Sequence, residues 1–338
     1  MAARLDEIAK QAGVSKSTVS RVLNERPGVS ARARMAVLAA IESLGYERPS
    51  VLRPRSFGLV GLIVPELQNP IFPIYAEVIE SNLARQGFTT VLGTMTPEGS
   101  GEDEYVGMLL DRKVSGIVFV SGLHADTLVD RSRYDDLARQ GVPFVLVNGA
   151  VPGLAVPSLS CDDALAGQLA VQHLAGLGHR RIGFISGPDR YTPVQRRLAG
   201  FRLAMHRHVG PGTADLIELT SFDIAGGQAA ATRLLDRGAT ALVCGNDLMA
   251  LGAIRAVRRH GLRVPEDVSV IGADDSPLMA YTDPALTTVR HPVLAIGAAA
   301  ARALADRIKG RAHSTGEQLF DPELVIRAST GPCPDGRP

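Results

Sequence analysis

The chain has 338 residues and nearly balanced charges, for a net charge of +1. Its 45% hydrophobic and 21% charged residues are typical of a globular protein and exclude a disordered or fibrous chain. No apolar run reaches the roughly 18 residues of a membrane span and no secretory leader opens the sequence, so we expect a cytoplasmic protein without a membrane partner. Three scattered cysteines and eight histidines without metal-ligand spacing predict neither a disulfide framework nor a metal site, and no motif calls for a cofactor.

Two short helices joined by a tight turn are predicted at the start of the chain. Gly13 can adopt the left-handed conformation that ends the first helix, and Ser15 can cap the second. The second helix has an apolar back, formed by Val19, Val22 and Leu23. Its polar front is formed by Ser17, Ser20, Arg21 and Asn24, with Lys16 at its leading edge, and Thr18 is a further candidate contact nearer the phosphates. A front of hydroxyl, amide and guanidinium groups is suited to the major groove of DNA.

A third helix is predicted from Ser30 to Leu44. Met35, Leu38, Ile41 and Leu44 recur on one side of it and would close a three-helix unit. The N-terminal 55 residues carry ten basic and five acidic side chains, whereas the rest of the chain is net negative. This asymmetry places a nucleic-acid surface at the N-terminal end. The alternative is an ordinary solvated basic segment on a larger domain.

From Leu59 onward, short apolar runs alternate with helical patterns. The predicted strands are 59–65, 89–94, 116–121, 143–148, 181–187, 241–246 and 269–275. The predicted helices are 75–86, 163–176, 226–237 and 248–260. Buried strands that alternate with helices are typical of parallel sheets. Two such sets predict two doubly wound subdomains, with a ligand at the carboxyl ends of the strands.

The segment AGVSKSTVSRVLN is similar, almost position for position, to the helix-turn-helix of the LacI/GalR transcription regulators. The similarity continues to about Thr330. It implies an all-α DNA-binding domain followed by a periplasmic-binding-protein-like α/β ligand domain, whose subdomains are joined by crossovers near 161, 290 and 319. The implied parts are a DNA-binding domain (1–46), a linker (47–58), an N-subdomain (59–161 and 291–318), a C-subdomain (162–290 and 319–332) and a disordered tail (333–338). The strings PELQNPIF, FVSGLHADT and PFVLVNG most resemble actinobacterial regulators of maltose and related glucoside operons.

The Pro- and Arg-rich linker departs from the family pattern. In relatives, the resemblance implies, this segment forms a hinge helix whose leucine wedges into the minor groove. Pro54 would end such a helix early, and the family's wedge position is not leucine here. Leu52 is the candidate wedge, while Arg53 and Arg55 are suited to phosphates or a narrow minor groove. The alternative is a plain flexible tether.

Candidate effector residues lie near the ends of the predicted strands. Arg197, in the R-x-x-G-F signature, and Asn246 and Asp274 match ligand contacts of sugar-binding relatives. A guanidinium fork suits two hydroxyls or a carboxylate, and Asn and Asp fix hydroxyl orientation. The full set is Asn69, Phe72, Asn148, Asp162, Arg197, Phe222, Asn246 and Asp274. The alternatives are core packing for the phenylalanines, a surface salt bridge for Arg197, and turn or cap roles for the others. Because the chain has no Trp and 4% aromatic residues, we expect polar contacts rather than stacking platforms to carry specificity.

The sequence therefore predicts a regulator that binds double-stranded DNA at a pseudo-palindromic operator as a homodimer. A sugar effector, a glucoside or maltooligosaccharide, would release it from carbohydrate-utilisation genes. The alternative within the family is a corepressor-type response to a purine or another small metabolite. Two other classes are a soluble sugar-binding protein and an α/β enzyme acting through a carboxylate pair. The carboxylates considered are Asp162, Asp163, Asp274 and Asp275. No phosphate loop GxxxxGK[ST] and no nucleophile elbow GxSxG is present, so we do not expect an enzyme.

Overall fold

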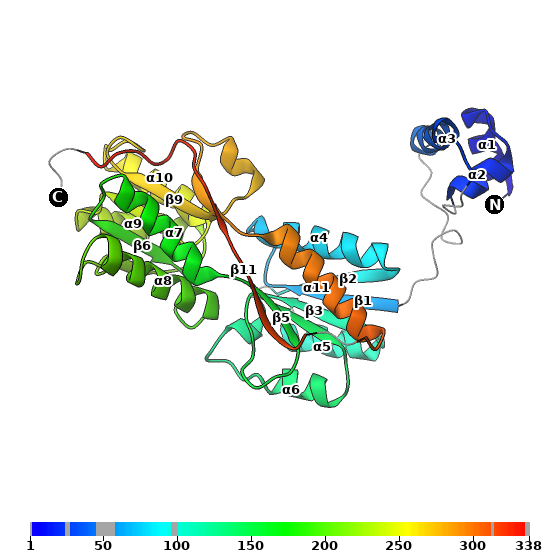
Figure 1. Cartoon of the computed structure of the whole chain (residues 1–338), viewed down its shortest axis with the longest axis horizontal. Helices are drawn as coiled ribbons and strands as arrows, with labels where there is room; N and C mark the ends of the chain where they lie inside the picture. Colours follow the sequence, from blue (N-terminus) through cyan, green and yellow to red (C-terminus); the bar gives the residue numbers. More distant parts are fainter. Residues whose placement is uncertain (1, 24–27, 45–57, 96–100, 312–313, 335–338) are drawn as a thin grey trace. The chain divides into compact units, whose positions relative to one another are not determined.

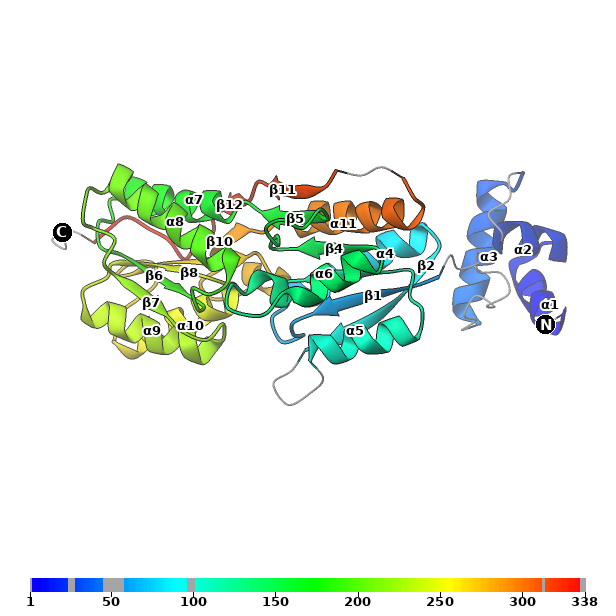
Figure 2. The same cartoon turned by 90° about the horizontal axis from the view of Figure 1, so that it is seen from below.

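The computed structural model describes residues 2–23, 28–44, 58–95, 101–311 and 314–334 (Figures 1 and 2). The chain divides into two compact units, Met1–Ser56 and Phe57–Pro338. We call them the DNA-binding unit and the ligand unit, after the roles that the sequence predicts. Within the described ranges, no helix has both the length and the apolar character that crossing a membrane requires.

The DNA-binding unit contains three helices, α1 (Ala2–Ala12), α2 (Lys16–Leu23) and α3 (Ala31–Ser43). The predicted turn between the first two is confirmed. Gly13 has φ of +65°, and the next residue's N–H donates to the carbonyl of Ala9 at 3.0 Å, which closes the end of α1. The hydroxyl of Ser15 accepts the Thr18 N–H at 3.1 Å and so caps α2.

The three helices enclose a small apolar core. Its buried members are Ile8, Ala9, Val19, Val22, Leu23, Val37 and Ala40. The predicted inner face of α3 is wrong at two positions, because Met35 is 71% exposed and Leu38 is 42% exposed. The stripe that faces the core instead runs through Val37, Ala40, Ile41 and Leu44, spaced three, four and seven residues apart. Ile41 and Leu44 were therefore correctly predicted to face the core. The rotation of α3 about its axis was predicted incorrectly, since Met35 and Leu38 face outward.

The ligand unit consists of two subdomains, each built on a six-stranded sheet. The N-subdomain sheet has the order β11-β5-β4-β3-β1-β2, and the C-subdomain sheet has the order β12-β10-β9-β8-β6-β7. The first sheet comprises β1 (Gly58–Val64), β2 (Phe88–Thr94), β3 (Gly116–Val120), β4 (Phe144–Val147), β5 (Pro157–Cys161) and β11 (Gly316–Phe320). The second comprises β6 (Ile182–Ser186), β7 (Ile217–Leu219), β8 (Ala241–Cys244), β9 (Ser269–Asp274), β10 (Thr287–Arg290) and β12 (Glu323–Val325). All described pairings are parallel except β10 with β12, which confirms the predicted parallel sheets.

Helices cover both faces of each sheet (Figure 2). Around the first sheet lie α4 (Ile71–Arg85), α5 (Glu102–Asp111), α6 (Ser132–Arg139) and α11 (Val293–Ile308). Around the second lie α7 (Asp163–Gly176), α8 (Thr192–His208), α9 (Ile224–Asp236) and α10 (Asp247–Arg259). Separate apolar clusters form under α4 with α11, under α5 with α6, under α7 with α8, and under α9 with α10. The two doubly wound subdomains are as predicted.

The chain crosses between the sheets after β5, β10 and β11. The third crossover follows Phe320, close to the predicted position near 319, since β11 pairs with β5 as far as Cys161. Cys333, which was placed in the predicted tail, is a described residue whose N–H donates to the carbonyl of Leu177 at 2.8 Å. Strands β5, β7, β10, β11 and β12 were not predicted, and of these β5 and β10 carry buried serines and threonines instead of an apolar run. Each crossover therefore leads from one sheet directly into the other subdomain, at the ends of the strands where a ligand was expected.

Candidate functional site

The DNA-binding unit presents the predicted polar front on α2. Lys16, Ser17 and Arg21 are exposed, while Thr18 and Ser20 are half-buried. The apolar back of the same helix is buried, which confirms the predicted division into two faces. The ammonium of Lys16 lies 2.5 Å from the carboxylate of Asp6 on α1. The remaining predicted DNA contacts, Asn24, Leu52, Arg53 and Arg55, lie outside the described residues.

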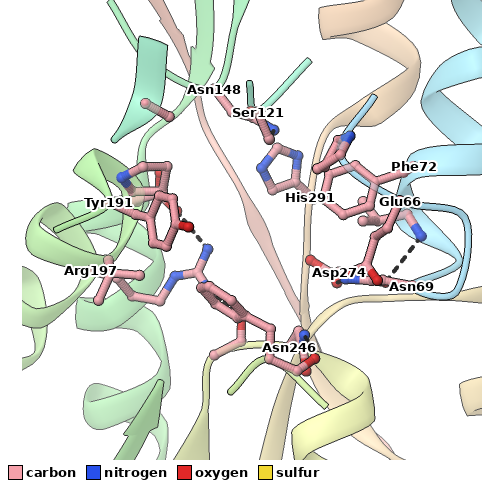
Figure 3. A pocket seen from close by; sticks show the side chains of 18 residues that line it. Glu66, Asn69, Phe72, Ser121, Asn148, Tyr191, Arg197, Asn246, Asp274 and His291 are labelled. Carbon is pink, nitrogen blue, oxygen red and sulfur yellow. Dashed lines mark hydrogen bonds and ion pairs between the residues drawn. The ribbon is translucent and has the colours of Figure 1, made fainter. Parts of the chain in front are cut away.

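The ligand unit contains a pocket at the carboxyl ends of strands from both sheets (Figure 3). Seven of the eight predicted effector residues line it, namely Asn69, Phe72, Asn148, Arg197, Phe222, Asn246 and Asp274. Lining residues outside that set include Glu66, Ser121, Asp163, Tyr191 and His291. In Figure 3, Tyr191 and Arg197 lie across the pocket from Phe72 and Asn69. The pocket is therefore shared by the two subdomains.

Asp162 is the predicted residue that does not line the pocket. Its carboxylate accepts the Leu165 N–H at 2.9 Å and caps α7, so it is turned toward its own helix. The next residue, Asp163, lines the pocket instead and lies 2.6 Å from the guanidinium of Arg197. Burial raises the pKa of the Asp163 carboxyl, and Arg197 opposes that rise. Arg197 also donates to the carbonyl of Gly245, so the predicted surface alternative for this arginine is wrong.

Asn246 both lines the pocket and caps α10. Its side-chain oxygen accepts the Met249 N–H at 2.8 Å, and its amide nitrogen donates to the carbonyl of Phe222 at 3.0 Å. The following residue, Asp247, is buried and accepts hydrogen bonds from Ser276 N–H and the Thr288 hydroxyl, each at 2.7 Å. Burial raises the pKa of Asp247 to about 6. The predicted cap role and the predicted lining role thus coexist in Asn246.

Asp274 ends β9 in a left-handed backbone conformation, with φ of +111°. Its carboxylate accepts a hydrogen bond from the side-chain amide of the neighbouring Asn69, at 3.4 Å. Burial, together with the neighbouring Asp247, raises the pKa of Asp274 well above its usual range. The carboxyl of Asp274, on the C-subdomain, is therefore a pocket group that bonds to a residue of the N-subdomain.

Tyr75 on α4 connects two polar lining residues from behind the pocket. Its hydroxyl lies 3.0 Å from Nδ1 of His291 and 3.5 Å from the amide oxygen of Asn148. The amide nitrogen of Asn148 donates to the Ser121 hydroxyl at 2.9 Å. Burial lowers the pKa of His291 to about 3, so the imidazole is neutral at physiological pH. In the sequence, His291 is a single histidine after a Thr-rich strand, and no motif around it predicts that it lines the pocket.

Aromatic side chains contribute more to the pocket than the composition suggested. Phe72, Tyr191 and Phe222 all line it, and the rings of Tyr191 and Phe222 are 6.1 Å apart. Three of the chain's aromatic residues thus converge here, while the expectation that polar contacts carry the specificity stays a prediction. Polar and aromatic groups together are the usual composition of a site for a small organic ligand.

The four carboxylates considered for enzyme chemistry do not form a free pair. Asp162 caps a helix and Asp163 pairs with Arg197, as described above. Asp275 pairs with Arg290 at 2.8 Å and with Arg327 at 2.6 Å. Among the residues that the structure describes, no group of three or more His, Cys, Asp or Glu side chains is arranged to hold a metal ion.

Comparisons with known proteins match both units. Residues 4–49 match the family described as "Bacterial regulatory proteins, lacI family", and residues 171–330 match the "Periplasmic binding protein-like domain". The chain is 56% identical over 344 residues to the HTH-type transcriptional regulator MalR of Streptomyces coelicolor, with both chains covered completely.

Two solved structures are similar over nearly the whole chain. A complex of the transcriptional regulator CelR with cellobiose has a TM-score of 0.73 at 33% identity, covering 96% of this chain and 99% of that one. A lac repressor dimer bound to operator and the anti-inducer ONPF has a TM-score of 0.71 at 29% identity, covering 96% and 98%. Similarity therefore extends through both units and not only through the helix-turn-helix.

Proposed function

Because the chain belongs to the lacI family of bacterial regulatory proteins, we propose that it is a transcriptional repressor released from its operator by a neutral saccharide. The proposed effector is a glucoside or maltooligosaccharide that occupies the pocket between the subdomains. The observation that carries this proposal is the set of polar groups in that pocket, which come from both sheets and suit hydroxyl ligands.

The charges of the pocket favour a neutral ligand. Arg197 is the one Lys or Arg among the lining residues, and its charge is already paired with Asp163. Two further carboxyls, those of Glu66 and Asp274, also line the pocket. A phosphate or carboxylate ligand would therefore meet acidic groups without a free cation to bind it. Hydroxyls can instead bond to the Asp and Asn side chains, while aromatic faces cover the apolar surface of a sugar ring.

On DNA, we assign base contacts to Lys16, Ser17 and Arg21. Thr18, Ser20 and Asn24 are assigned to the backbone phosphates, as are Arg53 and Arg55, with Leu52 as a minor-groove wedge. One short helix reads too few base pairs for useful specificity, so a homodimer on a pseudo-palindromic operator is part of the proposal. The structural neighbour described as a lac repressor dimer bound to operator supports this arrangement.

The coupling would run through the movement of the two subdomains. A ligand that joins the two halves of the pocket changes their relative orientation, and in a dimer this resets the spacing of the two linkers. Coupling free energies of this kind are typically about 1–3 kcal/mol, or roughly 5- to 150-fold in affinity. We expect operator affinity to fall by that factor when the effector binds.

The test is operator affinity, measured by fluorescence anisotropy with maltose, maltotriose, cellobiose and a glucose phosphate in turn. A neutral saccharide should weaken operator binding, and the phosphate should not. Asp274→Asn should blunt the response while leaving operator affinity without sugar unchanged. If every saccharide leaves operator affinity unchanged, the sugar-effector proposal is wrong. Incubation of the same sugars with the protein should give no product, since we propose a binder and not an enzyme.

The second candidate effector is a purine. Phe72 lies across the pocket from Tyr191, and Phe222 packs near Tyr191, so a flat ring could also be covered by aromatic surfaces. A purine would act as a corepressor, so hypoxanthine or guanine would tighten operator binding. A fall in operator affinity would therefore indicate a sugar effector, and a rise would indicate a purine corepressor.

A further inference from the structure

The leading end of α8 carries much of the C-subdomain side of the pocket. Tyr191, Pro193, Val194 and Arg197 all line the cavity from this short stretch. Two further arginines within it, Arg190 and Arg196, are not lining residues. Each of them reaches a carboxylate of the N-subdomain instead. The two contacts join the subdomains beside the pocket.

The first contact joins Arg190 to the segment after β3. Arg190 Nε lies 3.1 Å from the carboxylate of Asp126, whose side chain is only 2% exposed. The carbonyl of Arg190 accepts both the N–H and the hydroxyl of Thr127, each at 2.8 Å. Asp126 and Tyr191 also form an antiparallel bridge of the backbone. One ion pair and two hydrogen bonds to the Arg190 carbonyl thus meet next to a lining residue.

The second contact joins Arg196 to the edge strand β11. Its two terminal nitrogens donate to the two carboxylate oxygens of Glu317, at 2.7 and 2.6 Å. The hydroxyl of Ser160 on β5 donates to the same carboxylate at 2.6 Å, which fixes its orientation. Paired bonds of this geometry are stronger and more directional than a single contact. Arg196 and Arg197 are adjacent in sequence, yet one binds across the subdomains and the other lines the pocket.

We propose that Asp126 and Glu317 are positioning residues, which hold the leading end of α8 against the N-subdomain and so set effector affinity without touching the effector. A ligand that contacts both halves of the pocket binds only when the halves are joined. Its apparent dissociation constant is therefore the intrinsic one divided by the fraction of molecules that are joined. Loss of either contact lowers that fraction and weakens binding. The ligand part of this inference rests on the proposed function, whereas the joining of the subdomains does not.

The chain offers matched controls for both contacts. Glu218 on β7 pairs with Arg233 on α9 at 2.7 Å, and both lie in the C-subdomain. The side chains of Glu218 and Glu317 are each 19% exposed, and those of Arg233 and Arg190 are 49% and 46% exposed. Glu317→Gln is therefore compared with Glu218→Gln, and Arg190→Gln with Arg233→Gln. Each pair of variants removes the same charge at similar exposure, either across the subdomains or within one.

The first measurement is hydrogen exchange of the full-length protein without ligand. Peptides containing Thr127 should exchange faster in Glu317→Gln and Arg190→Gln, because the amide of Thr127 donates to Arg190. The two control variants should leave that exchange rate unchanged. The double variant that swaps the charges, Arg196→Glu with Glu317→Arg, should recover most of the protection. Equal exchange in the test and control variants would overturn the proposal.

The second measurement is the affinity of the full-length protein for maltose, by calorimetry. Each test variant should weaken binding about 2- to 5-fold, the range expected of a single partly exposed ion pair, and the controls should not. If exchange responds as expected but maltose does not bind even the unaltered protein, the joining role stands and the sugar effector fails. If maltose binds all four variants equally, Asp126 and Glu317 do not set effector affinity and the inference is wrong.

Discussion

The DNA-binding unit and the ligand unit present their functional side chains in opposite ways. On α2, the polar front is exposed or half-buried, and the fold is held by the buried apolar back. In the pocket, the same side chains that would meet a ligand also hold the fold. Arg197 neutralises buried Asp163, and Asn246 caps α10. Function and stability are thus separate in one unit and combined in the other.

This difference has a consequence for mutational tests. If α2 reads DNA as proposed, a substitution on its front reports mainly on DNA recognition, because few contacts within the protein are lost. A substitution in the pocket changes binding and the free energy of unfolding together, because the lost group had a structural partner. Loss of binding in a pocket variant therefore identifies a ligand contact only when its stability has been measured as well.

The largest expected effect is the loss of one partner of the buried ion pair. Asp163→Ala leaves the Arg197 guanidinium buried without its carboxylate, which should lower the free energy of unfolding by about 3–5 kcal/mol. Asp6→Ala removes the partner of Lys16 in an exposed pair and should cost less than about 1 kcal/mol. Urea unfolding followed by circular dichroism measures both. Adding Arg197→Met to Asp163→Ala should recover part of the loss, and comparable losses in the two single variants would contradict the comparison.

Acid should remove the contribution of the buried histidine His124 to the stability of the ligand unit, a loss without counterpart in residues 1–56, which contain no histidine. Burial lowers the pKa of His124 to about 4. A histidine with a lowered pKa binds more protons unfolded than folded below pH 6.5. Its contribution is therefore present above that value and is lost as the pH falls toward 4, by up to about 3 kcal/mol. His124→Gln should flatten this fall in thermal unfolding measured from pH 7 to 4. An equally steep fall in that variant would exclude His124 as the cause.

Most of the architecture could be predicted from the sequence, because apolar strands and capped helices are local patterns. Two parallel sheets, three N-terminal helices and the two faces of α2 follow from spacing alone. Strands β5 and β10 could not be predicted in this way, since their buried Ser and Thr side chains give no apolar run. The phase of α3 was misjudged because Met35 and Leu38 are large and apolar but face outward.

The pocket could be predicted where its residues follow a strand or match a family motif. Arg197, Asn246 and Asp274 were found through family spacing, and the structure brings all three together. Tyr191 and His291 belong to the pocket because remote segments pack beside them, and no pattern around either residue reveals this. Asp162 was chosen over its neighbour because adjacent acids look alike in sequence, whereas the start of a helix turns one to the backbone and the other to the cavity.

A smaller effect is expected from Arg21, the exposed arginine at the end of α2. If it contacts a guanine edge, Arg21→Ala should lower discrimination between operator and random DNA by about 1–3 kcal/mol. The free energy of unfolding should change by less than about 0.5 kcal/mol, as at other exposed positions. Anisotropy titrations on both DNAs measure the first quantity, and urea unfolding measures the second. Equal loss of affinity for the two DNAs would assign Arg21 to the phosphates.

Asn246 is the pocket residue at which the two roles can be separated, and the loss of stability expected there is small. Asn246→Ala removes the cap of α10 and should lower the free energy of unfolding by about 1 kcal/mol. Asn246→Ser keeps an oxygen that can accept the Met249 N–H, so it should retain stability within a few tenths of a kcal/mol. Both variants lose the amide that lines the pocket, so both should bind maltose more weakly in calorimetry. If Asn246→Ser binds the sugar as well as the unaltered protein does, this asparagine serves the fold alone, and the overlap between fold and function is narrower than the pocket geometry indicates.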